Sequence, residues 1–350
     1  MENKRRITLE NTIYSLVAPK TIEAKKSVIN EEDDVVIIKP THLSICHADQ
    51  RYYQGSRPPE VLAKKLPMAL IHEAIGNVVH DSKGEFKEGQ RVAMVPNTPF
   101  EEDDVVAENY LRSSKFRASG FDGFMQEYVA MRRDRVIPVS ETIDPDVAAF
   151  TELCSVSYHV IDRFDKIAHS RRDIVGVWGE GNVGYITALL FKKRFPESKL
   201  YIFGVVEEKM KEFTFADEVF SVSNIPEDVH VDHAFECVGS KPSGTAINQM
   251  IDPVINPEGT IALMGVSEDP VPINTRMVLE KGLRLFGSSR SSNDNFRDLV
   301  ALYEKYPDVP ELLKIIIGDV VEINSIDDMH TAFEKDINNG SRKTVMHWNL

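Results

Sequence analysis

Side chains that could bind a metal ion occur in three separate segments of the sequence. Thiolate, imidazole and carboxylate groups are the ligands that zinc prefers, and a catalytic zinc uses about three of them and keeps one position open. The candidates are Cys46, Asp49, His72, Glu73, Glu152 and Cys154. Because the segments lie far apart, each residue taken alone also fits a plain structural role, such as a buried thiol or a surface carboxylate.

A glycine-rich segment could bind a dinucleotide. Residues 179–184 read GEGNVG, follow an apolar run at 174–178 and open an expected helix at 183–195. Gly179 permits a tight turn, Gly181 lets the backbone approach a pyrophosphate, and Gly184 lets the helix pack on the sheet. The helix N-terminus, which includes Val183, offers N–H groups to phosphate oxygens. In this context the motif favours dinucleotide binding over the alternative, an ordinary glycine turn between a strand and a helix.

The elements that must position these groups change in character near residue 150. Before it, short β-type runs are separated by glycine turns, and a polar segment at 96–120 is predicted to form a lobe. After it, strand and helix patterns alternate, which indicates a parallel sheet covered by helices. The expected early strands are 35–38, 74–79, 91–95 and 125–129; a helix is expected at 147–164; the later strands are 174–178, 200–206, 233–237 and 260–264; and the last segment has a helix at 295–305 and a strand at 343–348.

Composition limits the function classes. A chain of 350 residues with 42% hydrophobic content is long enough for about two globular domains. Its net charge of -14 argues against nucleic-acid or anionic-membrane partners. Cys46, Cys154 and Cys237 are too few for a disulfide framework, and there is neither a secretory signal pattern nor a long apolar run. We therefore expect a cytoplasmic protein.

The order of these motifs resembles the zinc-dependent medium-chain alcohol and polyol dehydrogenases. Residues 123–128 (GFMQEY) and 236–239 (ECVG) resemble two further family segments. The resemblance implies an α/β chain with a GroES-like, β-rich catalytic domain and a Rossmann domain with a doubly wound parallel sheet. The expected boundaries are 1–155 for the first part of the catalytic domain, 156–290 for the Rossmann domain and 291–350 for the return segment.

The resemblance also implies roles for the candidate ligands. Cys46 and His72 would bind one catalytic zinc, with Glu73 as a direct or exchanging ligand. Glu152 stands where the sorbitol-dehydrogenase-like branch has its late glutamate, and we favour it over Cys154 as the last ligand.

Other positions match the family's cofactor and substrate contacts. Asp49 would orient His72, and His47 would contact the cofactor pyrophosphate. Tyr52 matches a substrate-pocket tyrosine of the polyol enzymes, and Gly239 ends the family's fourth-strand motif beside the cofactor.

Two departures from the family pattern are informative. Alcohol dehydrogenases carry a proton-relaying Ser or Thr two residues after the first zinc cysteine, whereas this chain has Ala48. A zinc-bound water or a substrate hydroxyl would have to replace that relay. The lobe at 96–120 contains no cysteine, so the resemblance implies one zinc per chain and no structural zinc.

The second strand of the Rossmann domain predicts the cofactor. NAD enzymes place an acidic residue at its end to hold the ribose 2′-OH. The family register puts Gly204 there, with Lys209 able to approach a 2′-phosphate, so NADPH is the expected cofactor. The alternative is that the strand runs on and Glu207 takes the acidic role.

A closer resemblance, on residues 49–57, 65–68, 119–126 and 287–291, is to the ribitol-5-phosphate dehydrogenases (ribulose-5-phosphate reductases) of teichoic-acid and capsule synthesis. It implies NADPH-dependent reduction of D-ribulose 5-phosphate to D-ribitol 5-phosphate. A cytidylyltransferase would consume the product, and the chain would form a dimer or tetramer.

A phosphorylated substrate needs local cations in an acidic protein. Arg51, Arg57 and Arg290 are the leading candidates because guanidinium groups bind phosphate bidentately. Lys64 and Lys65 are weaker candidates. Two alternatives stay open: an oxidative dehydrogenase for an unphosphorylated sugar alcohol, and a non-catalytic cofactor-binding protein on the same fold.

Overall fold

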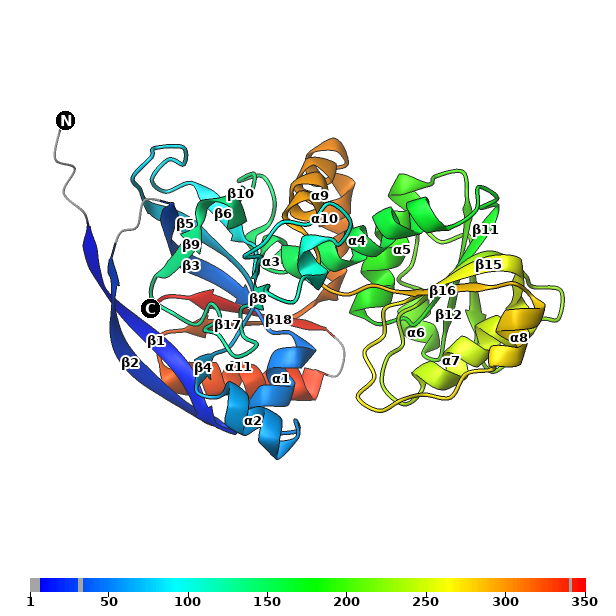
Figure 1. Cartoon of the computed structure of the whole chain (residues 1–350), viewed down its shortest axis with the longest axis horizontal. Coiled ribbons are helices and arrows are strands. Elements are labelled where there is room, and N and C mark those ends of the chain that lie inside the picture. The colour runs from blue at the N-terminus through cyan, green and yellow to red at the C-terminus, as the bar shows by residue number, and fades with distance from the viewer. Residues whose placement is uncertain (1–6, 31–33, 340–341) are drawn as a thin grey trace. The chain divides into compact units, whose positions relative to one another are not determined.

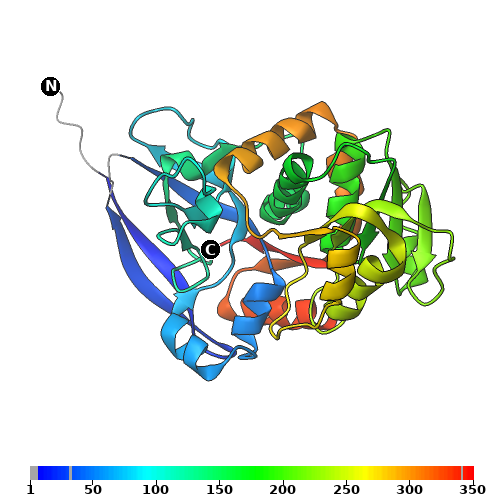
Figure 2. The same cartoon turned by 45° about the vertical axis from the view of Figure 1, so that its right-hand side comes forward.

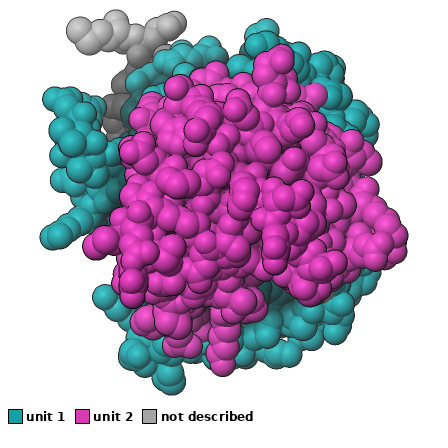
Figure 3. All heavy atoms as spheres, turned by 90° about the vertical axis from the view of Figure 1, so that its right-hand side faces the viewer, with its two compact units in different colours: residues 1–153, 291–350 teal, residues 154–290 magenta. Residues whose placement is uncertain are grey.

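The computed structural model describes residues 7–30, 34–339 and 342–350. Contacts divide the chain into two compact units, residues 1–153 with 291–350 and residues 154–290, which Figure 3 colours separately. The first division falls after Leu153, inside a helix, rather than after residue 155. No helix among the described residues is long and apolar enough to cross a membrane.

The first unit is built on a mixed β-sheet that brings together segments from both ends of the chain (Figure 1). In the described residues the order is β10 (Val136–Pro138), β6 (Arg91–Met94), β5 (Glu73–Asp81), β3 (Val35–Ser44), β18 (Lys343–Trp348) and β17 (Ile317–Ile323), with β9 (Val129–Arg132) also paired to β3. β18 runs antiparallel to β3 and parallel to β17, so the C-terminal segment completes the sheet that the first third of the chain begins.

Shorter strands and helices complete the first unit. A long antiparallel ribbon, visible in Figures 1 and 2, is formed by two strands and extended by a third, while a small hairpin lies in the 96–120 lobe. These strands are β1 (Thr8–Ala18), β2 (Thr21–Asn30), β4 (Met68–Ala69), β7 (Asn97–Thr98) and β8 (Lys115–Phe116). The helical segments are α1 (His47–Tyr53), α2 (Pro59–Lys65), η1 (Glu108–Tyr110), η2 (Arg133–Arg135), α3 (Pro145–Ala149), α9 (Asn293–Lys305), α10 (Asp308–Leu313), η4 (Lys314–Ile316) and α11 (Ile326–Asn339).

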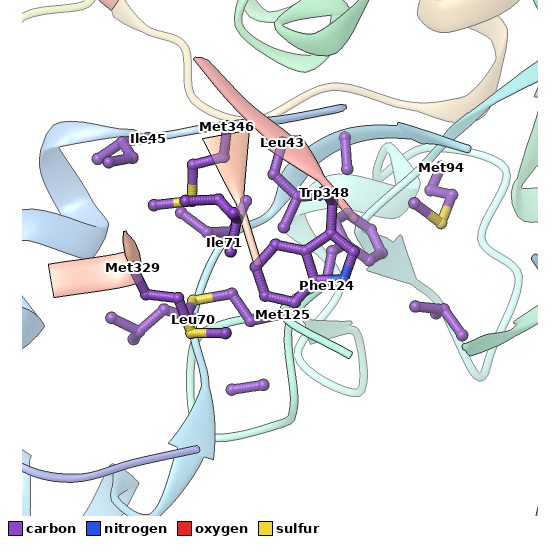
Figure 4. Packing of buried hydrophobic residues seen from close by; sticks show 14 of the residues in the cluster. Leu43, Ile45, Leu70, Ile71, Met94, Phe124, Met125, Met329, Met346 and Trp348 are labelled. Atoms are coloured by element: carbon purple, nitrogen blue, oxygen red, sulfur yellow. The ribbon is translucent and has the colours of Figure 1, made fainter. Parts of the chain in front are cut away.

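The hydrophobic core of the first unit lies directly beneath the segments that carry the candidate ligands. Figure 4 shows Ile45, Ile71 and Met346 in this core, and each is at most 2% exposed. Ile45 precedes Cys46 and Ile71 precedes His72 in sequence, so burial of these two side chains fixes the backbone from which the ligands project. Trp348 closes the core and donates its indole N–H to the carbonyl of Gln126 at 2.9 Å.

The second unit is a parallel sheet, and its order shows the predicted doubly wound fold. The strands are β13 (Glu218–Ser221), β12 (Lys199–Gly204), β11 (Ile174–Trp178), β14 (Val231–Glu236), β15 (Ile255–Leu263) and β16 (Arg284–Gly287), in that spatial order. All of their pairings are parallel. Numbered from the first strand of the unit, this is the order 3-2-1-4-5-6 of dinucleotide-binding sheets.

Helices connect these strands, and aromatic side chains fill the space beneath them. The helices are α4 (Thr151–Ile167), α5 (Asn182–Arg194), α6 (Glu207–Met210), α7 (Ser243–Gln249), η3 (Met250–Val254) and α8 (Thr275–Glu280). α5 packs on β11 and β12, and α7 packs on β14. The rings of Trp178 and Phe203, on neighbouring strands, stack with centroids 3.8 Å apart.

Three expected elements differ from the observed ones. The run 125–129 is a regular strand only from Val129, because the backbone N–H groups before it donate singly to different segments, as Met125 does to Leu70 and Glu127 to Thr12. The helix expected at 147–164 is interrupted at Phe150, which separates α3 from α4. The strand expected at 200–206 ends at Gly204.

Candidate active site

The candidate zinc ligands lie where two neighbouring strands of the first unit meet. β3 and β5 are antiparallel with Ser44 opposite Glu73, so the end of one strand is adjacent to the start of the other. Cys46 lies two residues beyond β3 as the N-cap of α1, and His72 immediately precedes β5. Glu152 joins them from the first turn of α4.

The predicted ligands are brought together in space. Ligand atoms of His72, Glu73 and Glu152 lie within 4.8 Å of one another, and the same holds for Cys46, Asp49 and His72. Glu152 and Cys154 lie on one helix two residues apart, which places their side chains roughly 200° apart around its axis. The carboxylate of Glu152 is the one that faces His72 and Glu73.

The backbone that presents His72 is strained. Ile71 has a φ of 69°, a conformation that β-branched residues rarely adopt and that costs on the order of 1–3 kcal/mol. Its N–H donates to Asp49 Oδ1 at 3.0 Å, and its carbonyl accepts from the N–H of Phe124 at 2.7 Å. Both hydrogen bonds and the buried side chain hold Ile71 in this conformation and thereby fix the direction of His72.

Asp49 connects the two ligand-bearing segments. Its Oδ2 lies 3.3 Å from His72 Nδ1 and also accepts from the N–H of Cys46 at 3.3 Å. With Nδ1 directed at this carboxylate, Nε2 is the ring nitrogen left for a metal ion, which is the arrangement usual for zinc-ligating histidines.

A buried lysine completes the cluster, and the sequence analysis gave it no role. Lys343, the first residue of β18, is 4% exposed and lies 2.9 Å and 2.8 Å from the two carboxylate oxygens of Glu73. It also donates to the carbonyl of Ile45 at 2.7 Å. A lysine at the start of a mostly apolar strand is the signal in the sequence, but it does not identify the partner. Lys343 and Glu73 are 270 residues apart and meet only through the pairing of β18 with β3 and of β3 with β5.

The electrostatics of the cluster fit a divalent cation. Burial raises the pKa of the Cys46 thiol, and burial together with the charge of Glu73 raises the pKa of Glu152 to about 7, although His72 and Lys343 oppose that shift. Burial alone would lower the pKa of His72, but Asp49 and Cys46 raise it well above its ordinary value. Buried acidic groups thus exceed the buried cations, and a bound zinc ion would supply the missing positive charge.

The polar lobe adds one contact to this cluster. Phe116, on β8, has its ring centroid 5.3 Å from that of His72 at an angle of 58°. The lobe therefore covers one side of the imidazole with an apolar surface. Nothing in the spacing of the sequence identified Phe116.

Two of the three arginines proposed for phosphate binding lie together on and after α1. The guanidinium of Arg57 lies 4.4 Å from the centroid of the Tyr52 ring, and its Nε is buried with no hydrogen-bond partner in the described part of the chain. Burial and the charge of Arg57 lower the pKa of Arg51. The charge of Arg57 acts on Arg51, so the two guanidinium groups are near neighbours. Lys65 instead donates to the carbonyl of Ser119 at 2.6 Å.

In the second unit the glycine loop has the geometry that the motif predicts. Gly179 has a φ of +111°, and a Cβ at Gly184 would meet the carbonyl oxygen of Gly179 at 1.8 Å. A Cβ at Gly181, the N-cap of α5, would meet nothing within 4 Å, so its backbone borders open space at the helix N-terminus. Val183 lies in the first turn of this helix.

The end of the second Rossmann strand contains a carboxylate that the sequence analysis missed. Gly204 is the last residue of β12, and Glu207 begins α6 instead of continuing the strand. Glu180, from the glycine loop, accepts hydrogen bonds from the N–H groups of Val205 at 3.2 Å and Val206 at 3.0 Å. The Glu180 carboxylate therefore brings a negative charge to the end of β12, although Gly204 itself has no carboxyl side chain.

The remaining predicted residues occupy separate places. His47 is the exposed first residue of α1, and Lys209 is half-buried in α6. Gly239 has a φ of +70°, and its N–H donates to the buried carboxylate of Glu236 at 2.9 Å. Arg290 is the last residue of the second unit.

Comparison with known proteins identifies both units. Residues 32–141 match the alcohol dehydrogenase GroES-like domain, and residues 204–305 match the zinc-binding dehydrogenase domain. Ribulose-5-phosphate reductase 1 of Staphylococcus aureus is 53% identical over 97% of this chain and 99% of that protein. The ribulose-5-phosphate reductase of Bacillus spizizenii is 51% identical over 97% of this chain and 99% of its own length.

A solved structure agrees with the sequence matches. The crystal structure of S. aureus TarJ in complex with NADPH superposes with a TM-score of 0.88 and 48% identity, covering 98% of this chain and 100% of that one. The catalytic-domain fold, the parallel sheet and the full-length identity lead to one conclusion: the chain belongs to the zinc-dependent medium-chain dehydrogenases and, within them, to the ribulose-5-phosphate reductases.

Proposed function

We propose that this chain reduces D-ribulose 5-phosphate to D-ribitol 5-phosphate with hydride from NADPH. The observation that carries the proposal is helix α1, which has a candidate zinc ligand, Cys46, at its start and the cation Arg51 in its last turn. They are five positions apart, which is roughly 7.5 Å of helix rise. One short helix thus holds both a metal ligand and an anion-binding group, as reduction of a sugar phosphate requires.

The relatives support the same substrate and cofactor. Two relatives at 51% and 53% identity are named ribulose-5-phosphate reductases, and the TarJ structure was solved in complex with NADPH. In this chain Lys209 is the proposed partner of the 2′-phosphate, and the glycine loop, with Gly239, receives the rest of the cofactor. His47 is the proposed pyrophosphate contact from the first unit.

The zinc ion would be held by Cys46, His72 and Glu152, with Glu73 as an additional ligand that exchanges. When bound, zinc supplies Lewis-acid stabilisation of the negative charge that develops on the substrate carbonyl oxygen. Asp49 holds the His72 ring through Nδ1. Lys343 holds Glu73 in a buried ion pair, and this contact would compete with coordination of the ion by the Glu73 carboxylate.

Substrate orientation falls to the side chains at the end of α1. Arg51 and Arg57 would bind the phosphate, Tyr52 supports the Arg57 guanidinium by stacking, and Arg290 is the third proposed cation. Because Ala48 cannot relay a proton, the proton for the new hydroxyl must come from solvent or from a substrate hydroxyl.

The resemblance to capsule and teichoic-acid enzymes supports three further proposals. The chain acts in the cytoplasm, it forms a dimer or tetramer, and a cytidylyltransferase consumes its product. The polyol phosphate that the reaction yields is a chemically suitable acceptor for nucleotidyl transfer.

Product analysis tests the proposal. Zinc-loaded protein is incubated with ribulose 5-phosphate and NADPH, and the product is compared chromatographically with ribitol 5-phosphate and arabinitol 5-phosphate. We expect ribitol 5-phosphate in a one-to-one ratio with NADP+. Failure to oxidise NADPH with this substrate, together with turnover of an unphosphorylated polyol, would replace the proposal with a plain polyol dehydrogenase.

A further inference from the structure

Three metal-ligating side chains outside the predicted zinc site lie together in the first unit. They are His42 on β3, Asp146 on α3 and His347 on β18, and one ligand atom from each lies within 4.8 Å of the others. The reaction proposed above uses none of them.

The pairing of the sheet builds this cluster. His42 and His347 are register partners on β3 and β18, and His347 and Glu322 are register partners on β18 and β17. Directly opposite residues of neighbouring strands project from the same face of a sheet. The side chains of His42, His347 and Glu322 therefore form a row across the three strands. The centroids of the two imidazole rings are 4.6 Å apart.

Both imidazoles direct Nε2 at one carboxylate. Asp146 Oδ1 lies 2.7 Å from Nε2 of His347 and 4.0 Å from Nε2 of His42. The other ring nitrogens are already engaged: His347 Nδ1 lies 2.7 Å from Glu322 Oε1, and His42 Nδ1 lies 3.1 Å from Thr41 Oγ1. Metal-binding histidines characteristically donate their second N–H to such an acceptor.

Spacing and exposure suit a small transition-metal ion. Zinc bonds to nitrogen and oxygen are about 2.0–2.2 Å long, so tetrahedral ligand atoms lie roughly 3.3 Å apart. The observed separations of 2.7 Å and 4.0 Å lie on either side of that value. The side chains of His42, Asp146 and His347 are 20%, 21% and 29% exposed, so an ion can enter and a solvent molecule can complete its coordination.

We propose that His42, Asp146 and His347 form a second metal site, which binds a divalent transition-metal ion such as Zn²⁺ through the two Nε2 atoms and the Asp146 carboxylate. This ion is additional to the catalytic zinc. Binding of the metal ion displaces the proton between His347 Nε2 and Asp146. Nδ1 of His347 keeps its proton and donates it to Glu322. The ion would join β3, β18 and α3.

A competing explanation uses no metal ion. Burial lowers the pKa of His347, but its hydrogen bonds to Asp146 and Glu322 raise it overall, so a protonated His347 could bridge the two carboxylates. His42 also faces Asp144 and Arg91. Arg91 is itself paired with Glu141 at 2.9 Å, which reduces its repulsion of a cation. A protonated His347 can bridge Asp146 and Glu322 without His42, whereas the metal site requires His42 as a ligand.

The test counts bound zinc. Full-length protein is equilibrated with zinc chloride at pH 7.5 and analysed by equilibrium dialysis and elemental analysis. We expect two ions per chain for wild type and for the exposed control His230→Ala, and one for His42→Ala and His347→Ala. Cys46→Ser should lose the catalytic ion and keep the second. Glu322→Gln, which preserves side-chain shape, should weaken the second ion about 10–100-fold.

Cobalt distinguishes the sites spectroscopically. In Cys46→Ser, Co²⁺ at the second site should give d–d bands without a thiolate charge-transfer band, because no sulfur is among its ligands. Circular dichroism, and reductase activity of the zinc-loaded histidine variants, show that these variants are folded. The proposal is overturned if wild type saturates at one zinc ion, or if both histidine variants retain the second.

Discussion

At the residue scale, the chemistry of the first unit depends on how buried charges are balanced. Glu152, Glu73 and Asp49 surround His72, and Lys343 is the buried cation that pairs with Glu73. The order of these ligands in the chain carries the resemblance to the medium-chain dehydrogenases, and that resemblance predicted the cluster. The role of Lys343 was not predictable, because it depends on a strand pairing between the two ends of the chain.

Substitution of Glu152 should release the catalytic zinc. Glu152→Gln keeps the side-chain volume but removes the charged ligand, so we expect zinc affinity to fall by at least about tenfold and activity to fall with it. Cys154→Ser is the matched control on the same helix and should retain its catalytic zinc after dialysis against zinc-free buffer. Loss of zinc from Cys154→Ser, with retention in Glu152→Gln, would transfer the ligand role to Cys154.

Glu180 should limit the preference for NADPH. Its carboxylate lies at the end of β12, where a 2′-phosphate is expected, and two like charges about 4 Å apart in water repel by about 1 kcal/mol. Glu180→Gln keeps an oxygen that can accept from Val205 and Val206, so KM for NADPH should fall roughly fivefold while KM for NADH changes little. Glu207→Gln, at the exposed start of α6, is the control and should change neither KM appreciably. A rise in KM for NADPH in Glu180→Gln would show that the carboxylate assists binding.

At the element scale, α1 links the metal cluster to the proposed phosphate site, and Gln50 fixes the helix by donating to the carbonyl of Phe333 at 2.9 Å. The alternation of strands and helices was sufficient to predict the parallel sheet, and β11 has the predicted bounds. The strand at 125–129 was misplaced because its residues have β propensity, while their backbone groups pair singly with other segments instead of forming a ladder.

Arg51, on α1, and Arg57, which follows this helix, should act on the phosphate group alone. Arg51→Ala and Arg57→Ala should each raise KM for ribulose 5-phosphate by about tenfold or more, since charge-assisted hydrogen bonds contribute about 1.5–3 kcal/mol. Turnover of unphosphorylated ribulose should stay at the wild-type level in both variants. Lys65→Ala is the control, because Lys65 is bound to Ser119. Equal losses with both substrates would indicate a structural defect in α1 instead of a lost phosphate contact.

A buried histidine should make the second unit sensitive to acid. His233 Nδ1 accepts from the N–H of Thr260 at 3.1 Å, and Nε2 lies 3.0 Å from the carbonyl of Arg171, so the folded protein holds the neutral ring. Burial, assisted by His169, lowers the pKa of His233 from 6.5 to about 4. Between these values the unfolded chain takes up a proton that the folded chain does not. Stability is therefore full above pH 6.5 and decreases as the pH falls toward 4.

Urea unfolding measured at pH 7.5 and pH 5 checks this prediction. The contribution of His233 to the difference should be about 2 kcal/mol, and it should be absent in His233→Gln, whose amide can both accept and donate. The exposed His230→Gln should behave like wild type. If His233→Gln loses as much free energy of unfolding as wild type between the two pH values, His233 is not the titrating group.

At the scale of the whole molecule, the fold class followed from the sequence because two independent signals agreed. One is the glycine loop after an apolar strand, and the other is the change near residue 150 from short strands separated by turns to alternating strands and helices. The second cluster of histidines was not predictable, because His42 and His347 come together only through sheet register. The position of Glu180 was equally hidden, since it depends on how the glycine loop folds toward the end of β12.

A comparison of substrates tests most directly whether this molecule is a reductase for a phosphorylated sugar. Initial rates are measured with NADPH and either D-ribulose 5-phosphate or D-ribulose, using zinc-loaded protein. Since a bound phosphate adds at least one charge-assisted interaction of about 1.5–3 kcal/mol, kcat/KM should be more than about tenfold higher for D-ribulose 5-phosphate than for D-ribulose. Equal or greater kcat/KM for free ribulose would contradict the account.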